Sequence, residues 1–503
     1  MTDRLRFGTA GLRGPLGSGP LCMNVELVEL AAMAIAGWLP EHSTVVIGRD
    51  ARYGSLDFAN VTARVLSEAG HLPQVFREPV PTPVVAFAVA TSEAAAGVMV
   101  TASHNPATDN GYKVYTADGG QLLPGDAAAI EATMASLPWP DEVATAPAPG
   151  VETLDAAVVD AYLATITESV STLGASFVDT KAPVTVAYSA MHGVGGALFQ
   201  RALTAAGHVM HIVAEQHDPD PDFPTAAFPN PEEPGTLDLS IALAERVDAD
   251  IILANDPDAD RLAVAVRRSS GWERLTGDEI GVLLAWYVLE SVERPCTVAN
   301  SIVSSTLLAK LAAARDVRHE ATLTGFKWLA RAGQPEAPLA FAYEEALGYS
   351  VVPAIPDKDG ISAGLAFADL IASLMAEGHI IDDLLAALAD EFGHHLTAHV
   401  SVRFDGSDSM AQLSTLMSTL RERRPAAIGE FAVVETVDLV EPDGDLPSSN
   451  VLIFNLDGGR LIVRPSGTEP KIKAYLEVVH SDLNQAKADL EQLRVATQRL
   501  LAS

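Results

Sequence analysis

The stretch VTVAYSAMHGVGGALFQRALTAAG, residues 184–207, indicates the fold class of the chain. A short β-branched run passes through a glycine-rich turn into a segment of helical character, as in a strand that is followed by a covering helix. Residues 43–70 have the same order, and in residues 94–106 an apolar run ends at a polar loop. Residues 249–266 read as two strands that flank an acidic loop. We therefore expect α/β domains with mainly parallel sheets.

The length of the chain and the positions of its proline-rich segments predict several domains. The 503 residues are several times a typical domain, so we expect three or four. We interpret the proline-rich residues 137–150 as a linker and residues 217–235 as a long loop inside the second domain. Residues 275–290 predict an amphipathic helix that opens a third domain. Alternating polar and apolar residues at 395–404 predict an antiparallel sheet near the end of the chain.

Composition limits the partners. Lys and Arg number 33 against 66 Asp and Glu, and the resulting charge of −33 argues against nucleic acid or an anionic membrane as a partner. An anionic substrate would then require a local group of cations. Cys22 and Cys296 are too few for a disulfide framework or a thiolate metal site, which fits a reducing compartment. No run approaches the length of a membrane span, so we predict a cytoplasmic protein.

The loop TASHNPATDNGYKVY, residues 101–115, follows an apolar strand, where open α/β sheets bind their ligands. That position presents Ser103 as an exposed hydroxyl. A serine is a weak nucleophile unless a base or metal activates it, and His104 and Lys113 are near in sequence. The alternative is an ordinary turn or helix cap, since Ser, Asn and Pro favour turns for local reasons.

The loop DPDADR, residues 256–261, places Asp256, Asp258 and Asp260 at alternate positions after a strand. Such carboxylates can converge on one hard cation and leave room for a phosphate oxygen, which is how magnesium is usually bound. Arg261 can contact a phosphate with two nitrogens. A solvated acidic turn is the alternative.

The loop RPSGTEPKIKAY, residues 464–475, surrounds a glycine turn between two strands with polar and cationic side chains. The backbone amides of such a turn can form an anion site, which hydroxyls and a guanidinium complete. A plain hairpin turn is the alternative, although these cations in so acidic a chain favour phosphate. The candidate residues are Arg464, Ser466, Gly467, Thr468 and Lys473.

Three weaker signals remain. Glu344 and Glu345 in FAYEEALGY can accept hydrogen bonds from neighbouring sugar hydroxyls, or can mark an exposed helix start. Lys327 in TGFKW and Arg13 in RFGTAGLRG can each belong to an ordinary glycine turn with a surface cation.

Taken together and in this order, these loops resemble the motifs of the α-D-phosphohexomutase superfamily over nearly the whole chain. The motifs TGFKW and FAYEEALGY are most similar to those of its phosphoglucomutase/phosphopentomutase branch. The resemblance implies a heart-shaped protein with a central cleft. It would have three related α/β domains of mixed, mainly parallel sheet and a C-terminal α+β domain that is TBP-like. The implied ranges are 1–158 with the phosphoserine loop, 159–272 with the metal loop, 273–393 with the sugar loop and 394–503 with the phosphate loop.

The resemblance also implies roles. Ser103 would carry the phosphoryl group and would bind one Mg²⁺ per chain together with the three aspartates, with a sugar bisphosphate as activator. Lys113 or His104 would carry the proton. The remaining implied roles are catalysis for Arg13, His104, Lys113 and Arg261, sugar binding for Glu344, Glu345 and Lys327, and phosphate binding for Arg464, Ser466, Gly467, Thr468 and Lys473.

The implied activity is a phosphosugar mutase that interconverts a sugar 1-phosphate and 6-phosphate, glucose first and mannose second. Many hexose-specific members have Gly before the paired acids and Ser after them, whereas this chain has Tyr343 and Ala346. A phosphopentomutase therefore stays open. A metal-dependent phosphatase and a non-catalytic sugar-phosphate sensor are remoter alternatives. We expect a monomer or a homodimer.

Overall fold

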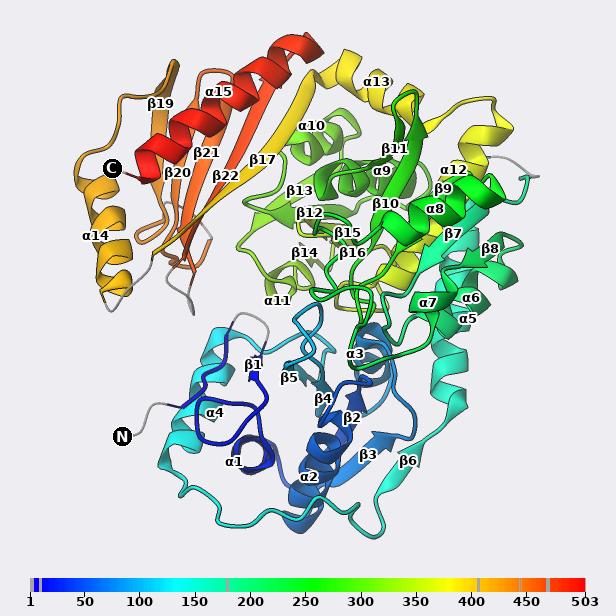
Figure 1. The fold of residues 1–503 in the computed structure, drawn as a ribbon, viewed down its shortest axis with the longest axis vertical. Helices are drawn as coiled ribbons and strands as arrows, with labels where there is room; N and C mark the ends of the chain where they lie inside the picture. The colour runs from blue at the N-terminus through cyan, green and yellow to red at the C-terminus, as the bar shows by residue number, and fades with distance from the viewer. Residues whose placement is uncertain are drawn as a thin grey trace. The chain divides into compact units, whose positions relative to one another are not determined.

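The chain forms two compact units in the computed structural model shown in Figure 1. Unit 1 comprises residues 1–298 and 325–381, and unit 2 comprises residues 299–324 and 382–503. The domain boundaries predicted from the sequence stay predictions. The structure describes residues 4–8, 11–177, 181–404, 408–442, 444, 446–466 and 471–502.

The first sheet has six strands in the order β1–β5–β4–β2–β3–β6. Strand β2 pairs in parallel with β3 and β4, and β3 does so with β6, whereas β5 is antiparallel to β1 and β4. Every residue of β4 is buried, as expected of a strand covered on both faces. The strands are β1 (Leu12–Pro15), β2 (Thr44–Arg49), β3 (Leu72–Phe76), β4 (Ala96–Val100), β5 (Asp109–Thr116) and β6 (Glu152–Leu154).

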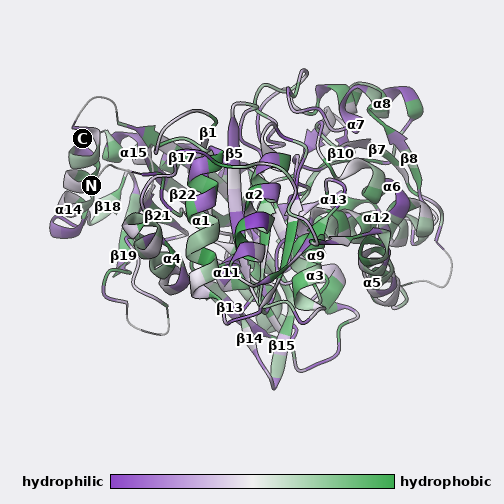
Figure 2. Cartoon of the chain, turned by 90° about the horizontal axis from the view of Figure 1, so that it is seen from below, coloured by the Kyte–Doolittle hydropathy of each residue, from purple (hydrophilic) through white to green (hydrophobic). Residues whose placement is uncertain are grey.

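Helices pack against this sheet. Helix α1 begins after Asn24, whose side chain accepts a hydrogen bond from the backbone amide of Leu27 at 2.9 Å and so caps the helix. Helix α3 is apolar along nearly its whole length, as Figure 2 shows, because it is buried in unit 1. The helices are α1 (Val25–Trp38), α2 (Ser55–Glu68), α3 (Thr82–Ala90) and α4 (Pro124–Ser136).

The second sheet has the order β11–β10–β9–β7–β8, with β7 parallel to β8 and β9. It confirms the strand, turn and helix predicted at residues 184–207 and the two strands predicted around the acidic loop. The elements are α5 (Ala156–Gly174), β7 (Thr185–Ser189), α6 (Gly196–Ala205), β8 (Val209–Ile212), α7 (Ala214–His217), α8 (Asp238–Val247), β9 (Ile251–Ala254), β10 (Ala263–Arg268) and β11 (Gly271–Arg274).

The third sheet has the order β13–β12–β15–β14, with β16 beside β15. Helix α9 confirms the helix predicted at residues 275–290, but the predicted amphipathic character is wrong because eleven of its residues are buried on all sides. The elements are α9 (Gly277–Leu289), β12 (Thr297–Ser301), α10 (Leu307–Ala314), β13 (Arg318–Thr322), α11 (Phe326–Leu329), β14 (Gly333–Gln334), β15 (Ala337–Glu344), β16 (Gly348–Ser350) and α12 (Gly360–Ala376).

The fourth sheet, in unit 2, is antiparallel throughout, with the order β17–β22–β21–β20–β19–β18. It confirms the change of class predicted for the end of the chain. Helices α14 and α15 bury apolar side chains in its core. The elements are α13 (Ile381–Phe392), β17 (His394–Arg403), α14 (Ser409–Glu422), β18 (Ala427–Ile428), β19 (Phe431–Asp438), β20 (Leu452–Leu456), β21 (Gly459–Pro465), β22 (Lys471–His480) and α15 (Leu483–Leu501).

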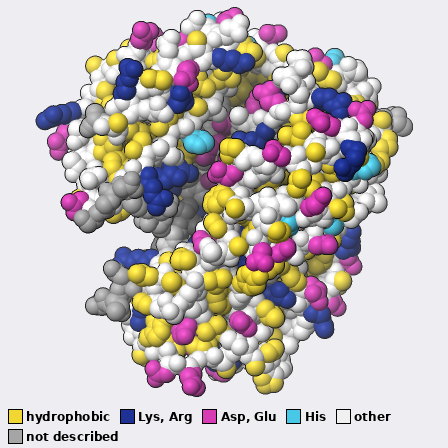
Figure 3. Space-filling model, viewed as in Figure 1, with side chains coloured by type: hydrophobic (Ala, Val, Ile, Leu, Met, Phe, Trp, Pro, Cys, Tyr) yellow, Lys and Arg dark blue, Asp and Glu magenta, His cyan; other side chains and the backbone are white. Residues whose placement is uncertain are grey.

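Figure 3 shows acidic and basic side chains interspersed over one face of the molecule. Within the described part of the chain, no single helix is long and apolar enough to cross a membrane. The helices α12 and α13 meet that limit only as a bent pair.

A buried carboxylate, Glu477 on β22, organises the core of unit 2. One of its oxygens accepts hydrogen bonds from Ser305 Oγ at 2.7 Å, from the backbone amide of Thr306 at 2.8 Å and from His395 Nδ1 at 2.9 Å. The other accepts from Arg460 Nε at 2.7 Å. Burial by itself raises the pKa of Glu477, but the His395 hydrogen bond and the Arg460 charge outweigh burial and lower the pKa to about 2.

We expect Glu477→Gln to lower the free energy of unfolding of unit 2 by about 3 kcal/mol at pH 7, because Arg460 would lose its buried counter-charge. The native carboxylate stabilises fully above its ordinary pKa of 4.5, and this contribution is lost as the pH falls toward about 2. Calorimetric unfolding of both proteins from pH 7 to pH 3 should therefore show the difference shrinking below pH 4.5.

Glu491→Gln is the matched control, because Glu491 forms an exposed ion pair with Arg494. A loss of stability that is equal in the two variants, or that does not depend on pH, would contradict this account of Glu477.

Candidate active site

Ser103 lies in the loop that follows β4, in left-handed backbone conformation with φ +52°. Its Oγ donates a hydrogen bond to Asp256 Oδ2 at 2.7 Å and lies 3.1 Å from His104 Nδ1. The serine is only 2% exposed, so the prediction of an exposed hydroxyl is wrong. The loop brings Ser103 against the acidic loop of the second sheet, 153 residues further along the chain.

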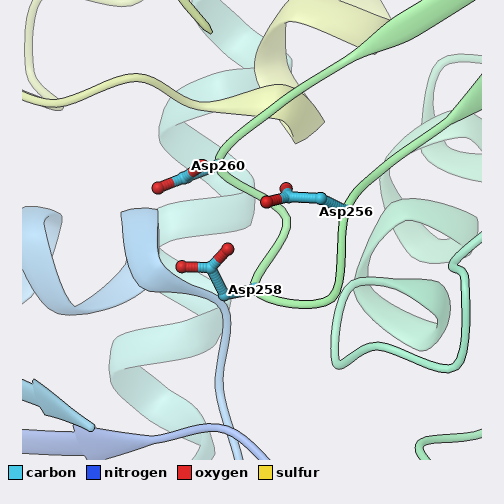
Figure 4. Close-up of side chains that lie close together, drawn as sticks. All are labelled: Asp256, Asp258 and Asp260. Atoms are coloured by element: carbon cyan, nitrogen blue, oxygen red, sulfur yellow. The ribbon is translucent and has the colours of Figure 1, made fainter. Parts of the chain in front are cut away.

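The acidic loop between β9 and β10 holds three fully buried carboxylates, those of Asp256, Asp258 and Asp260. One oxygen from each lies within 4.8 Å of the others, and Figure 4 shows the three around a common space. Among the described residues, Asp258 Oδ1 and Asp260 Oδ1 have no hydrogen-bond partner. Because buried oxygens rarely lack a partner, this donor set fits a hard divalent cation.

Two lysines balance part of this negative charge. Lys113 Nζ, from β5, lies 2.7 Å from Asp258 Oδ2 and 2.8 Å from Asp260 Oδ2. Lys358 Nζ lies 2.7 Å from Asp260 Oδ2. Thr82, at the start of α3, donates a further hydrogen bond to Asp258 at 2.6 Å. The cluster therefore joins the first sheet, the second sheet and the start of α12.

The cluster shifts the pKa values of its members in opposite directions. Burial and the charges of Asp258 and Asp260 raise the pKa of Asp256 well above its ordinary value. Burial acts the same way on Asp258, but the Lys113 charge and the hydrogen bonds from Lys113 and Thr82 together outweigh it and lower the pKa of Asp258. Burial, Arg261 and Arg13 lower the pKa of His104 well below 6.5. His104 is therefore neutral at pH 7.

Two glycines, Gly193 and Gly360, lie so close to the acidic loop that neither position has room for a side chain. A Cβ on Gly193 would lie 2.3 Å from Pro257 Cα, and one on Gly360 would lie 2.1 Å from the carbonyl oxygen of Arg261. The amide next to Gly193, that of Val194, donates to the Pro257 carbonyl at 2.8 Å. The glycine-rich turn at residues 189–196 thus fixes the position of the carboxylates.

Two more of the predicted cations, Arg261 and Arg13, lie at these loops. Arg261 donates its backbone amide to Asp256 Oδ1 at 3.1 Å, and its Nη1 lies 3.5 Å from Glu232. Arg13, on β1, donates to Asn105 Oδ1 at 3.2 Å. The Arg13 side chain therefore contacts the serine loop, whereas Arg261 contacts Asp256 through its backbone and Glu232 through its side chain.

The predicted sugar loop is the turn between β15 and β16. Glu344 Oε1 accepts a hydrogen bond from the backbone amide of Gly325 at 2.6 Å. Glu345 is half-buried, and burial together with the charges of Glu344 and Asp278 raises its pKa to about 8. Lys327 and Lys113 line one small pocket. The structure thus brings Lys327 beside a residue of the serine loop region.

The predicted phosphate loop joins β21 and β22 in unit 2. Arg464 and Lys473 are paired in register across these strands, and the backbone amide of Ser466 donates to the Lys471 carbonyl at 2.7 Å. The two strands predicted on either side of the glycine turn are confirmed. Gly467 and Thr468 lie outside the described residues.

Two cations of the site received no role from the sequence. Lys358 begins the segment KDGISA, residues 358–363. Arg52 ends the segment STVVIGRDAR, residues 43–52, which indicated only a strand that leads into a helix. A cation in a loop of so acidic a chain was the available signal for both.

Comparisons with known proteins agree with this arrangement. Four models of the phosphoglucomutase/phosphomannomutase family match the chain, namely α/β/α domain I at residues 4–140, domain II at 160–271, domain III at 276–392 and the C-terminal domain at 420–491. The chain is also 40% identical, over 498 residues, to a probable phosphomannomutase of Haemophilus influenzae, and the match covers 95% of this chain and 98% of that protein. The chain belongs to the phosphoglucomutase/phosphomannomutase family.

Other members of the family differ in their names. A human phosphopentomutase is 35% identical over 541 residues, with 97% of this chain and 88% of that protein covered. The crystal structure of a putative phosphomannomutase from Thermus thermophilus superposes over 100% of both chains with a TM-score of 0.77 at 22% identity, which shows the shared fold. The protein is thus a mutase of the α-D-phosphohexomutase superfamily, with the family's three α/β domains and C-terminal domain.

For this family member we expect Asp258→Asn to weaken the binding of a divalent cation at the three aspartates and to lower mutase activity by about 100- to 1,000-fold, because one of the three carboxylates would lose its charge. Calorimetric titration with Mg²⁺ and a mutase assay over a range of Mg²⁺ concentrations would measure both effects. Asp248→Asn is the control, since Asp248 is exposed and forms a surface ion pair with Arg267. Unchanged Mg²⁺ binding in Asp258→Asn would contradict the assignment.

Proposed function

We propose that this mutase transfers a phosphoryl group through Ser103 and interconverts a sugar 1-phosphate with a sugar 6-phosphate, glucose phosphate being the first substrate. The observation that carries the proposal is the contact of Ser103 Oγ with Asp256 at 2.7 Å, beside carboxylates that Lys113 neutralises. Phosphoryl transfer depends on positioning and on neutralised charge more than on a strong base, and this centre supplies both.

The metal that this donor set fits is Mg²⁺. Asp256, Asp258 and Asp260, with Ser103, would hold one ion per chain. The unpartnered Oδ1 atoms of Asp258 and Asp260 support this assignment. When bound, the ion supplies positive charge next to the phosphoryl oxygens.

The cycle has two transfers. The P–O bond to Ser103 breaks as a free hydroxyl of the substrate forms a new P–O bond. The proton of that hydroxyl passes to the neutral imidazole of His104, while Lys113 serves as the counter-charge of Asp258 and Asp260. The sugar bisphosphate then turns around in the site. Ser103 takes the phosphoryl group from the other end, and the proton returns to the oxygen that is released. A trace of sugar bisphosphate would phosphorylate Ser103 at the start and so activate the protein.

The remaining cations bind the anionic parts of the substrate in this proposal. Arg13 and Arg261 lie at the reacting centre, and Glu344, Glu345 and Lys327 would contact the sugar. The phosphate that does not react would bind to Arg464, Ser466, Gly467, Thr468 and Lys473. A cytoplasmic location and a monomer or homodimer remain predictions.

A pentose 1-phosphate/5-phosphate mutase is the second candidate, favoured by the sugar loop. Tyr343 is fully buried, and its OH donates to Asp278 Oδ1 at 3.0 Å, so this side chain is part of the core. Ala346 places a methyl group where many hexose-specific members have a serine hydroxyl. The human relative of this chain is named a phosphopentomutase, which supports the same alternative.

A mutase assay across glucose, mannose, ribose and deoxyribose 1-phosphates, with Mg²⁺ and a trace of sugar bisphosphate, tests the proposal. We expect isomerised product from the wild type and a loss of about 1,000-fold or more in Ser103→Ala, because the group that carries the phosphoryl is removed. Release of inorganic phosphate without isomerised sugar would indicate a phosphatase. Binding of sugar phosphates without turnover by folded wild type would indicate a sensor.

Ala346→Ser tests the sugar loop by itself. We expect the added hydroxyl to raise kcat/KM for glucose 1-phosphate relative to ribose 1-phosphate by about fivefold, since one well-placed hydrogen bond contributes roughly 1 kcal/mol. The assay is the same comparison of substrates on the purified variant. An unchanged ratio would mean that Ala346 does not select the sugar.

A further inference from the structure

Arg52 follows β2 and inserts its guanidinium beneath the serine loop. Its Nη2 donates to the carbonyl oxygens of Ser103 and Asn105, each at 2.6 Å. Its Nη1 donates to the carbonyl oxygens of Pro106 at 2.7 Å and Asp109 at 3.2 Å. One buried side chain thus binds four carbonyls of the loop that carries the proposed phosphoserine.

The guanidinium of Arg52 is itself held in place by Asp50. Asp50 is 1% exposed, and its Oδ2 lies 3.3 Å from Arg52 Nε. The other oxygen of Asp50 accepts hydrogen bonds from the backbone amide of Arg52 at 3.0 Å and from Ser55 Oγ at 2.6 Å. Because a buried cation needs a paired charge, Asp50 supplies the counter-charge and fixes the orientation of the guanidinium.

The long proline-rich loop at residues 217–235 closes this arrangement from the second domain. The ring of Phe223 lies 4.7 Å from Arg52 Cζ, a cation–π distance. In the same loop, Asp222 accepts a hydrogen bond from Tyr53 at 3.0 Å, and Phe228 packs edge-on against the His104 ring at 5.9 Å. The loop therefore contacts the serine loop and its support at three places.

The conformation of Ser103 explains why such support is needed. A non-glycine residue with positive φ is strained by about 1–2 kcal/mol, and it persists only where its surroundings fix it. The planar fork of arginine can donate to several carbonyls at once, whereas the lysine ammonium is a point charge with three donors. Relaxation of the loop would move Ser103 Oγ away from Asp256, which it contacts at 2.7 Å.

We propose that Arg52 is a positioning residue that holds Ser103 in its reactive conformation, and that Phe223 keeps the Arg52 guanidinium in place. This inference rests on the proposed role of Ser103 as carrier of the phosphoryl group. Arg52 does not touch the reacting atoms, so it acts on the rate of transfer and leaves the binding of the sugar phosphate unchanged.

The test compares Arg52→Lys, Arg52→Ala and Phe223→Leu with the wild type in the mutase assay. We expect kcat to fall by about 100-fold in both Arg52 variants and by about tenfold in Phe223→Leu, with KM for the sugar phosphate near the wild-type value, since a misplacement of about 1 Å costs such factors. The rate at which a labelled sugar bisphosphate phosphorylates Ser103, measured by mass spectrometry of the protein, should fall by the same factor as kcat.

Arg49→Lys is the matched control, because Arg49 is a neighbouring arginine that donates to the carbonyls of Asp50 and Arg77 and to none of the serine loop. We expect it to keep the wild-type kcat. Millimolar guanidinium chloride should restore activity to Arg52→Ala, while methylammonium chloride at the same ionic strength should not. Thermal unfolding identifies which variants are folded. If Arg52→Ala does not fold, Arg52→Lys still tests the proposal, because the lysine keeps a cation beside Asp50.

The outcomes separate the two proposals. If Ser103→Ala keeps activity in the same assay, the proposed function of Ser103 fails. If Ser103→Ala is inactive while folded Arg52→Lys has the wild-type kcat, only the positioning role of Arg52 is overturned. A rise in KM that accounts for the whole loss in the Arg52 variants, without rescue by guanidinium, would also overturn it. A wild-type kcat in Phe223→Leu would remove Phe223 from the proposal.

Discussion

The structure of unit 1 depends on the compensation of buried charge between Lys113 and the pair Asp258 and Asp260. The lysine comes from the first sheet and the aspartates from the second, and none of the three can be buried alone without a large desolvation penalty. Their pairing therefore holds the ends of two sheets together. Ser103 is placed against Asp256 as a result, so the charge that stabilises this part of the fold also builds the candidate site.

The local elements of the site were predictable from the sequence, and the contacts between them were not. Patterns within about ten residues predict the local features: the strand before Ser103, the turn after residue 189 and the carboxylates at alternate positions. The burial of Ser103 and the four carbonyls on Arg52 depend on residues 50 or more positions apart, for which a single sequence has no periodic signal. The resemblance to a family, which covered nearly the whole chain, supplied the grouping that local patterns could not.

In the proposed function, the choice of sugar would depend on a much smaller part of the molecule than the chemistry. The phosphoryl centre is buried and highly charged, whereas the sugar loop around Glu345 and Ala346 is half-buried and differs from hexose-specific members at single side chains. Relatives of similar identity accordingly have the names phosphomannomutase and phosphopentomutase. Such a division allows one phosphoryl chemistry to serve sugars of different length, because small changes in the loop leave the centre unaltered.

The Glu477 cluster affects how this chain can be divided. Ser305 and Thr306 lie in a segment of unit 2 that precedes the fourth sheet by about 90 residues, and they supply several of the donors that satisfy this buried carboxylate. A fragment that begins at residue 394 would contain Glu477 and Arg460 without those donors. The C-terminal part is therefore a poor unit for recombination between genes at that boundary, and an exchange that conserves its stability would have to include residues 299–324 as well.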